Sequence, residues 1–331
     1  MKEVMIILNQ ISILTLLGLI GFISGKTGYL PANAGTIISR VVVKLTAPLL
    51  VFITLSGRQL DTGNISNIVW IYVLGLIFMM ISFALGSFLC RVMQLEGATA
   101  NVYKMHSMFG NVIYLAFPLL SSLYGDDGLF YAVIFGIAND TLLWTLGIFL
   151  VNKREKASVK ENLKRLINSN TIALCLGLSV LVIKTIFGQS VYNIPYISQT
   201  SGFIYDSFHL LGSTTFPLSM LFIGLILSEI KIEKLSDLIK RVHIFILSLF
   251  RLILVPVLAT LLLVVIGRFI DPVAKYVIIL ELAMPCGTIV PALAAEYGSD
   301  YKSATENVFV TTVIGIFTLP FIVYLMQNLI R

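Results

Sequence analysis

The stretch "MPCGTIVPALAAEYG", residues 284–298, decides the fold, because it interrupts a helix in one of the most apolar parts of the chain. Pro285 and Pro291 stand close together in it, with a glycine and a threonine between them. A proline inside a helix removes one backbone hydrogen bond and clashes with the preceding turn. In hydrocarbon each unpaired backbone group costs several kcal/mol, so a break persists only where protein or a water-filled cavity satisfies it.

The composition around this stretch is that of an integral membrane protein. The 331 residues are 57% hydrophobic and only 12% charged, and the mean hydropathy is +0.95. A soluble domain carries about 25% charged residues. Hydropathy and turn signals predict an all-α protein with ten transmembrane helices. Their expected limits are 4–24, 35–56, 66–91, 98–123, 128–151, 169–187, 201–228, 242–267, 272–297 and 304–329.

The basic residues predict the orientation of these spans. Most of the 23 lysines and arginines fall on one set of alternate loops, including the basic loop at 152–168. The positive-inside rule makes that loop cytoplasmic and both termini extracytoplasmic, in a multi-pass protein of the plasma membrane. The excess of basic over acidic residues therefore reflects the membrane topology, and we expect no nucleic-acid partner. A lipid-binding role for the loop stays open.

An internal repeat divides the chain into two halves, 1–151 and 169–331. "FPLLSSLYGDD", residues 117–127, aligns without a gap with "VPALAAEYGSD", residues 290–300, and Pro48 aligns with Pro217 in a second pair. Each half holds five spans, and because five is odd the second half is expected upside down relative to the first. Inverted repeats are typical of secondary transporters, whose site lies near the bilayer midplane between the repeats.

The fourth span carries a matching interruption. "FGNVIYLAFPLL", residues 109–120, contains Gly110, Asn111 and Pro118. Interrupted helices at corresponding positions of both halves point to a transport site. The alternative is a plain proline kink in each span, which is common in membrane helices.

These stretches resemble the auxin efflux carrier family, which includes plant PIN carriers and bacterial malate and malonate permeases and is related to bile-acid sodium symporters. The resemblance covers essentially the whole chain and extends to "FPLSMLFIGLIL", residues 216–227. It implies that spans 4 and 9 cross. It also implies a scaffold of spans 1, 2, 6 and 7 and a moving core of spans 3–5 and 8–10. Family members move organic anions, and some are homodimers with elevator-like motion.

Carried over by position, the resemblance puts Asn111, Pro118, Pro285 and Pro291 at the crossing. Gly110 lies beside Asn111. Thr288 stands where many members carry an asparagine. The N-termini of half-helices carry partial positive charge and suit a carboxylate. Lys44, one turn before a proline, either attracts the anion or extends to the cytoplasmic interface.

Ionisable residues inside spans are expensive and usually functional. Asp140, flanked by Asn139, is a candidate for ion coupling, and the alternative is a structural ion pair with Arg251 or Lys44. Glu281, one turn before Pro285, either titrates or holds a cation, or it lines the outer vestibule. We expect no cofactor, and H⁺ and Na⁺ both stay open as the coupling ion.

The expected function is secondary transport of a small organic anion by elevator-type alternating access, with lipid as the other partner. The alternatives are a sodium-coupled bile-acid-type symporter and a transporter-like sensor that binds ligand without flux. We expect no enzyme and no catalytic residue, because no nucleophile–base cluster appears. The three histidines form no metal-binding pattern.

Overall fold

The computed structural model describes residues 2–59, 62–152, 168–187, 195–229 and 241–330, and within these ranges every regular element is a helix. The basic loop predicted at 152–168 lies almost wholly outside them. Seven helical stretches of the described residues are long and apolar enough to cross a membrane: Ala34–Ser56, Ile65–Val92, Val112–Val151, Ser169–Phe187, Gly202–Glu229, Val242–Phe269 and Tyr301–Leu329. The all-helical, multi-span prediction is therefore confirmed, whereas ten spans and the inverted repeat stay predictions.

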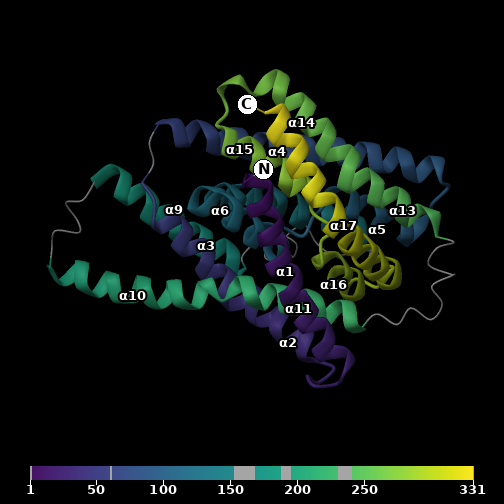
Figure 1. Cartoon of the computed structure of the whole chain (residues 1–331), viewed down its shortest axis with the longest axis horizontal. Helices are drawn as coiled ribbons and strands as arrows, with labels where there is room; N and C mark the ends of the chain where they lie inside the picture. The colour runs from purple at the N-terminus through teal and green to yellow at the C-terminus, as the bar shows by residue number, and fades with distance from the viewer. Residues whose placement is uncertain (1, 60–61, 153–167, 188–194, 230–240, 331) are drawn as a thin grey trace. The chain divides into compact units, whose positions relative to one another are not determined.

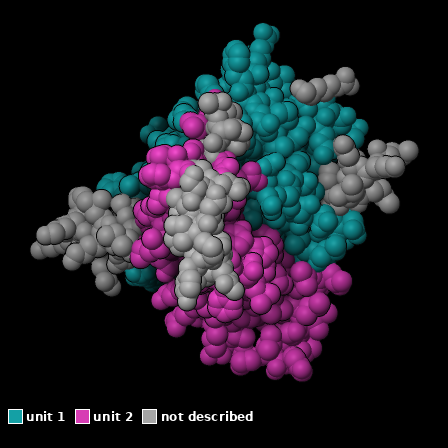
Figure 2. All heavy atoms as spheres, turned by 90° about the vertical axis from the view of Figure 1, so that its left-hand side faces the viewer, with its two compact units in different colours: residues 1–15, 67–163, 229–331 teal, residues 16–66, 164–228 magenta. Residues whose placement is uncertain are grey.

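The chain divides into two compact units, which Figure 2 shows in different colours. Unit 1 comprises Met1–Thr15, Asn67–Leu163 and Glu229–Arg331, and unit 2 comprises Leu16–Ser66 and Lys164–Ser228. The helix α1 (Lys2–Lys26) contributes to both.

Unit 1 contains most of the helices, and both predicted breaks lie in it. Its elements are α4 (Thr62–Val92), α5 (Gly97–Met108), η2 (Val112–Ala116), α6 (Phe117–Leu142), η3 (Leu143–Gly147), α7 (Ile148–Val151), α13 (Val242–Leu249), η5 (Phe250–Leu254), α14 (Val255–Ile266), η6 (Gly267–Phe269), α15 (Pro272–Ala283), α16 (Ile289–Glu296) and α17 (Tyr301–Leu329). The last helix, α17, packs against α5, α13, α14, α15 and α16, and Figure 1 shows its yellow ribbon running beside α13 and α14. A buried apolar cluster from α5, α7 and α16 includes Phe109 and Val290 beside the breaks.

Unit 2 consists of α2 (Ala34–Val41), η1 (Val42–Thr46), α3 (Ala47–Ser56), α9 (Ser169–Phe187), α10 (Pro195–Ser213) and α11 (Thr215–Glu229), with the rest of α1. The helix α3 packs against α9 and α10. Glycines bring α1 and α11 into backbone contact, because a Cβ on Gly21 would meet the carbonyl of Leu221 and one on Gly224 would meet that of Gly18. Small residues allow such close packing between apolar helices, where burial alone gives little driving force.

Three helices widen into a π turn directly before a proline. The π segments η1, η2 and η5 precede Pro48, Pro118 and Pro256, each within the first two residues of the following helix. Proline lacks an N–H group and its ring clashes with the carbonyl four residues earlier. A wider turn at that place relieves the clash without ending the helix.

The aligned Tyr-Gly pairs of the predicted repeat share a backbone turn. Gly125 has φ 60° and interrupts the helical run of α6, and Gly298 has φ 68° just after α16. Glycine adopts this left-handed region without steric cost, which explains its presence at both positions. Each turn separates the half-helix that follows a break from the next long helix.

Candidate functional site

The two predicted breaks lie against each other and pair through their backbones. The helix α5 ends at Met108 and α15 ends at Ala283, and neither continues directly into the next helix. The N–H group of Asn111 donates to the carbonyl of Pro285 at 2.9 Å, and that of Gly287 donates to the carbonyl of Phe109 at 3.0 Å. Gly110 and Cys286 thus face each other in an antiparallel β-bridge.

The bridge depends on small residues and on one side-chain acceptor. A Cβ on Gly287 would lie 2.8 Å from the carbonyl oxygen of Gly110, so the close approach requires glycine there. The backbone pairing of the bridge does not include the N–H group of Cys286. This group donates to Oγ1 of Thr311 on α17 at 3.0 Å. The breaks therefore persist in an apolar environment because their backbone groups find partners in one another and in α17.

Arg251 satisfies carbonyls of both broken helices. Its side chain is 2% exposed, and its Nε donates to the carbonyl of Met284 at 2.7 Å. One terminal nitrogen donates to the carbonyls of His106 at 3.0 Å and Ser107 at 3.1 Å. The last carbonyls of a helix lack intrahelical partners and carry partial negative charge. The alternative of an ion pair between Arg251 and Asp140 is wrong, because the guanidinium points to these carbonyls instead.

Glu281 is the buried acid of the site. It is 1% exposed, lies in the last turn of α15, and neither carboxylate oxygen has a hydrogen-bond partner among the described residues. Arg251 acts on it electrostatically without a hydrogen bond. A buried carboxylate in this position is stable only when a proton or a cation neutralises it.

Asn111 and Thr288 stand at the starts of the helices that follow the breaks. Asn111 is 2% exposed and directly precedes η2, and its amide nitrogen Nδ2 has no partner within the described part of the chain. Thr288 precedes α16, and its buried Oγ1 is likewise without a described partner. The first N–H groups of each helix also lack intrahelical acceptors. Both half-helix N-termini therefore combine positive partial charge with an adjacent spare polar group.

The other predicted site residues have different surroundings. Pro118 is buried at the start of α6, and Pro291 is partly buried in α16. Asn139 and Asp140 lie near the end of α6, where Nδ2 of Asn139 is 3.4 Å from the carboxylate and its Oδ1 has no described partner. Lys44 belongs to η1 of unit 2 and is exposed.

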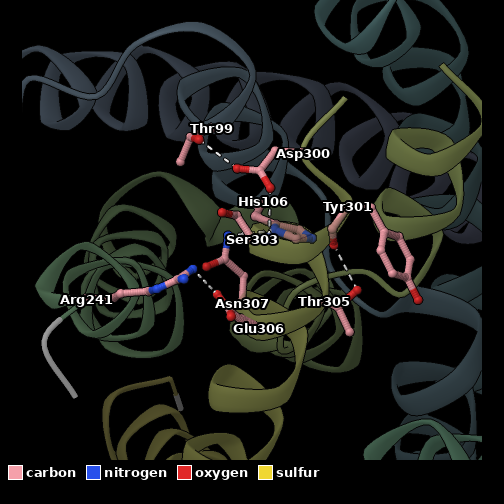
Figure 3. Close-up of polar contacts among 9 residues, drawn as sticks. All are labelled: Thr99, His106, Arg241, Asp300, Tyr301, Ser303, Thr305, Glu306 and Asn307. Atoms are coloured by element: carbon pink, nitrogen blue, oxygen red, sulfur yellow. Dashed lines mark hydrogen bonds and ion pairs between the residues drawn. The ribbon is translucent and has the colours of Figure 1, made fainter. Parts of the chain in front are cut away.

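The buried pair of His106 and Asn307 was missed by the sequence reasoning. His106 lies in the last turn of α5, and its Nδ1 lies 3.2 Å from Nδ2 of Asn307 on α17 (Figure 3). With the amide nitrogen of Asn307 as the donor, Nδ1 accepts, and a neutral imidazole then carries its proton on Nε2. The His106 Nε2 and Asn307 Oδ1 have no hydrogen-bond partner in the described ranges. No metal-binding pattern marks this histidine in the sequence, but a polar residue one turn before a break is itself a signal of a site.

Polar contacts fix the start of α17, as Figure 3 shows. The carboxylate of Asp300 caps this helix by accepting from the Ser303 N–H at 3.0 Å, and it accepts from the Thr99 hydroxyl at 2.6 Å. Arg241 forms an ion pair with Glu306 nearby. Burial alone raises the pKa of Asp300, but the hydrogen bonds from Ser303 and Thr99 outweigh it, and the pKa lies below its usual value. Asp300 is therefore the N-cap of α17.

A multi-span helical chain with two broken helices paired at their breaks has the architecture of a membrane transporter. The chain belongs to the membrane transport protein family, which matches residues 6–323. The resemblance to auxin efflux carriers is thereby confirmed, as is the prediction that the chain is no enzyme.

Two archaeal relatives extend over nearly the whole chain. One, from Methanocaldococcus jannaschii, is 26% identical over 98% of this chain and 100% of its own length. The other, from Methanothermobacter thermautotrophicus, is 23% identical over 94% of this chain and 95% of its own length. Both are described as uncharacterized transporters. The chain is therefore a multi-pass integral membrane transporter.

Proposed function

We propose that this chain is a secondary transporter that moves a small organic anion, a carboxylate, by elevator-type alternating access. Family membership supports transport. The observation that carries the choice of substrate class is the buried Asn111 amide, whose nitrogen has no partner among the described residues and stands at the start of a helix. A donor without an acceptor in an apolar environment is costly unless a ligand supplies one.

The surroundings of the two breaks favour an anionic ligand. A carboxylate would accept from Asn111 Nδ2 and from the first N–H groups of the following helix, and the Thr288 hydroxyl stands at the equivalent place on α16. The backbone bridge joins the two breaks, so both N-termini belong to one local structure. Positive partial charges from two helices then act on the same ligand group.

Coupling to an ion rests on two acids, the buried Glu281 and the partly buried Asp140. Glu281 lacks a described hydrogen-bond partner, so either H⁺ or Na⁺ would neutralise it. Within the described part of the chain Asp140 accepts one long hydrogen bond, from Nδ2 of Asn139 at 3.4 Å, and it is the second candidate. Both acids lie in unit 1, with the two breaks.

The proposed motion assigns unit 1 as the moving core and unit 2 as the scaffold, within a ten-span inverted repeat. The contents of the units support this assignment, because unit 1 holds the segments predicted as spans 3–5 and 8–10. The shared turns at Gly125 and Gly298 support the repeat. A homodimer, extracytoplasmic termini and attraction of the anion by Lys44 on the scaffold are further parts of the proposal.

The test is a thermal-shift screen of the purified protein against dicarboxylates, amino acids and aromatic acids, at several pH values with and without sodium. A ligand that binds the native state raises its thermal midpoint. A carboxylate that does so should then drive flux in proteoliposomes. The proposal is contradicted if no carboxylate shifts the midpoint, and binding without flux under any imposed gradient would establish the sensor alternative.

Asn111→Ala locates the site. Loss of a hydrogen bond to a charged ligand should weaken carboxylate binding roughly 10- to 100-fold. Asn328→Ala removes the same side chain at an exposed position near the end of α17 and should leave the dissociation constant unchanged. Equal affinities of both variants by calorimetry would remove Asn111 from the site.

A further inference from the structure

The carbonyl ends of the two broken helices are occupied by a side chain. We propose that the guanidinium of Arg251 acts as a permanent cation at the crossing. It binds the carbonyl ends of α5 and α15, where a coupling ion would otherwise bind. That this is the site of a coupling ion rests on the proposed function. That Arg251 positions the two breaks rests on its contacts alone.

The acceptors of Arg251 come from both helices. The carbonyls of His106 and Ser107 belong to the last turn of α5, and that of Met284 directly follows α15. In transporters with broken helices, unwound carbonyls and half-helix C-terminal ends are the groups that coordinate Na⁺. A guanidinium that bonds to three of them repels a free cation from the same oxygens.

The charge of Arg251 is balanced by these helix ends. Arg251 is 2% exposed and forms no ion pair with any carboxylate in the described ranges. Two helix C-termini together present negative partial charge to it, and Glu281 adds an electrostatic attraction without a hydrogen bond. Removal of the guanidinium would leave the carbonyls of both helices unsatisfied in an apolar environment, so the breaks should separate.

The bridge itself leaves room for the guanidinium. A Cβ on Gly110 would meet Nη2 of Arg251, the terminal nitrogen that does not bond to His106 and Ser107. The same Gly110 pairs with Cys286 in the bridge. Arg251 and the bridge therefore occupy one tightly packed volume. We assign Arg251 as a positioning residue that holds the C-terminal ends of α5 and α15 together at the bridge, and it does not contact the substrate in this assignment.

Thiol labelling gives a local readout of the crossing. Cys286 lies in the bridge and is fully buried, Cys90 is buried at the end of α4, and Cys175 is exposed. In a Cys175→Ser background, opening of the crossing should expose Cys286 alone, whereas global unfolding exposes Cys286 and Cys90 together. The labelling rates of the ligand-free protein with a maleimide are compared, so no transport substrate is needed and the result is independent of the substrate screen.

Arg251→Ala should raise the labelling rate of Cys286 by roughly tenfold or more and leave that of Cys90 unchanged, because the crossing opens locally. Guanidinium at about 20 mM, far below denaturing concentrations, should slow the labelling again by filling the space left by the side chain. Arg251→Met is the matched control, since methionine fills that space without charge and should show no response to guanidinium. Sodium should slow the labelling of Cys286 in Arg251→Ala and leave that of the wild type unchanged, because only the variant leaves the carbonyls to a simple cation.

Three results would overturn the proposal: unchanged protection of Cys286 in Arg251→Ala, equal guanidinium responses of the alanine and methionine variants, or slower labelling of wild-type Cys286 in sodium than in choline. Arg251→Lys serves if Arg251→Ala does not fold, because it keeps the charge and lacks the forked guanidinium that reaches both helix ends. It should expose Cys286 before Cys90, and equal exposure of the two thiols would also contradict the positioning role.

Discussion

The hydrogen bond between the Cys286 N–H group and Thr311 offers a quantitative test of how the breaks are stabilised. Thr311→Val keeps the shape of the side chain and removes the acceptor, so the N–H group is left buried without a partner. An orphaned buried donor costs about 1–3 kcal/mol. The expected loss in the free energy of unfolding is therefore about 1–3 kcal/mol, which corresponds to roughly 2–4 °C in thermal midpoint per kcal/mol for a chain of a few hundred residues.

Thr260→Val is the matched control for this substitution. Thr260 is also fully buried, and its hydroxyl donates to the carbonyl of Pro256 at 2.8 Å, as that of Thr311 donates to the carbonyl of Asn307 at 2.7 Å. Of these two threonines, only Thr311 accepts a hydrogen bond from a broken helix. The difference between the two variants therefore isolates the orphaned N–H group.

Two measurements check the prediction. Thermal unfolding in detergent should show a lower midpoint for Thr311→Val than for Thr260→Val, and amide exchange at residues 284–288 should be faster in Thr311→Val alone. A local opening made easier by 1.4 kcal/mol exchanges about tenfold faster. Equal midpoints and equal exchange in the two variants would refute the view that α17 completes the hydrogen bonding of the break.

Further predictions concern the bridge, the cap of α17 and the proposed coupling acid. Gly287→Ala should force the breaks apart and lower the thermal midpoint, because its Cβ would lie 2.8 Å from a carbonyl oxygen. Gly202→Ala should not, because its Cβ would have no described neighbour within 4 Å. Asp300→Ala should destabilise the protein by about 0.5–2 kcal/mol at neutral pH through loss of the cap, as measured by denaturant unfolding. The pKa of Asp300 is lowered in the fold, so this stabilisation is present above the unfolded pKa of about 3.9 and is lost as the pH falls through the folded pKa. The stabilities of the variant and the wild type should therefore converge in acid. A stability difference that stays constant with pH would contradict the assignment of Asp300 as the cap. Asp140→Asn should abolish the pH or sodium dependence of carboxylate flux in proteoliposomes, and wild-type ion dependence would exclude Asp140 from coupling.

The breaks themselves were predictable because they follow from local chemistry. Pro285 and the glycines beside Asn111 and Thr288 disfavour a regular helix whatever surrounds them. The turns at Gly125 and Gly298 likewise follow from residues that tolerate a left-handed backbone. The sequence therefore located the interrupted segments, and the resemblance correctly implied that the chain belongs to a transporter family.

The partners of the breaks were not predictable, because they come from helices far apart in the chain. Nothing near Arg251 in the sequence indicates that it will bond to carbonyls at His106 and Met284, and an apolar span with one arginine is equally compatible with an ion pair. The hydroxyl of Thr311 carries no local signal that it accepts from Cys286. Such contacts depend on how helices pack, which the periodicity of a single helix does not determine.

The bridge also has a consequence for biosynthesis. The first break needs partners from the second, since the Asn111 N–H and the Phe109 carbonyl bond to Pro285 and Gly287. A ribosome completes the first half of the chain well before it reaches residues 284–288, so in the interval these two backbone groups lack their final partners. Until the second half is made, the backbone groups of the first break must therefore bond to water, lipid headgroups or the insertion machinery. Its stable placement in the bilayer is expected to be a late, post-insertion step that couples the two halves during assembly.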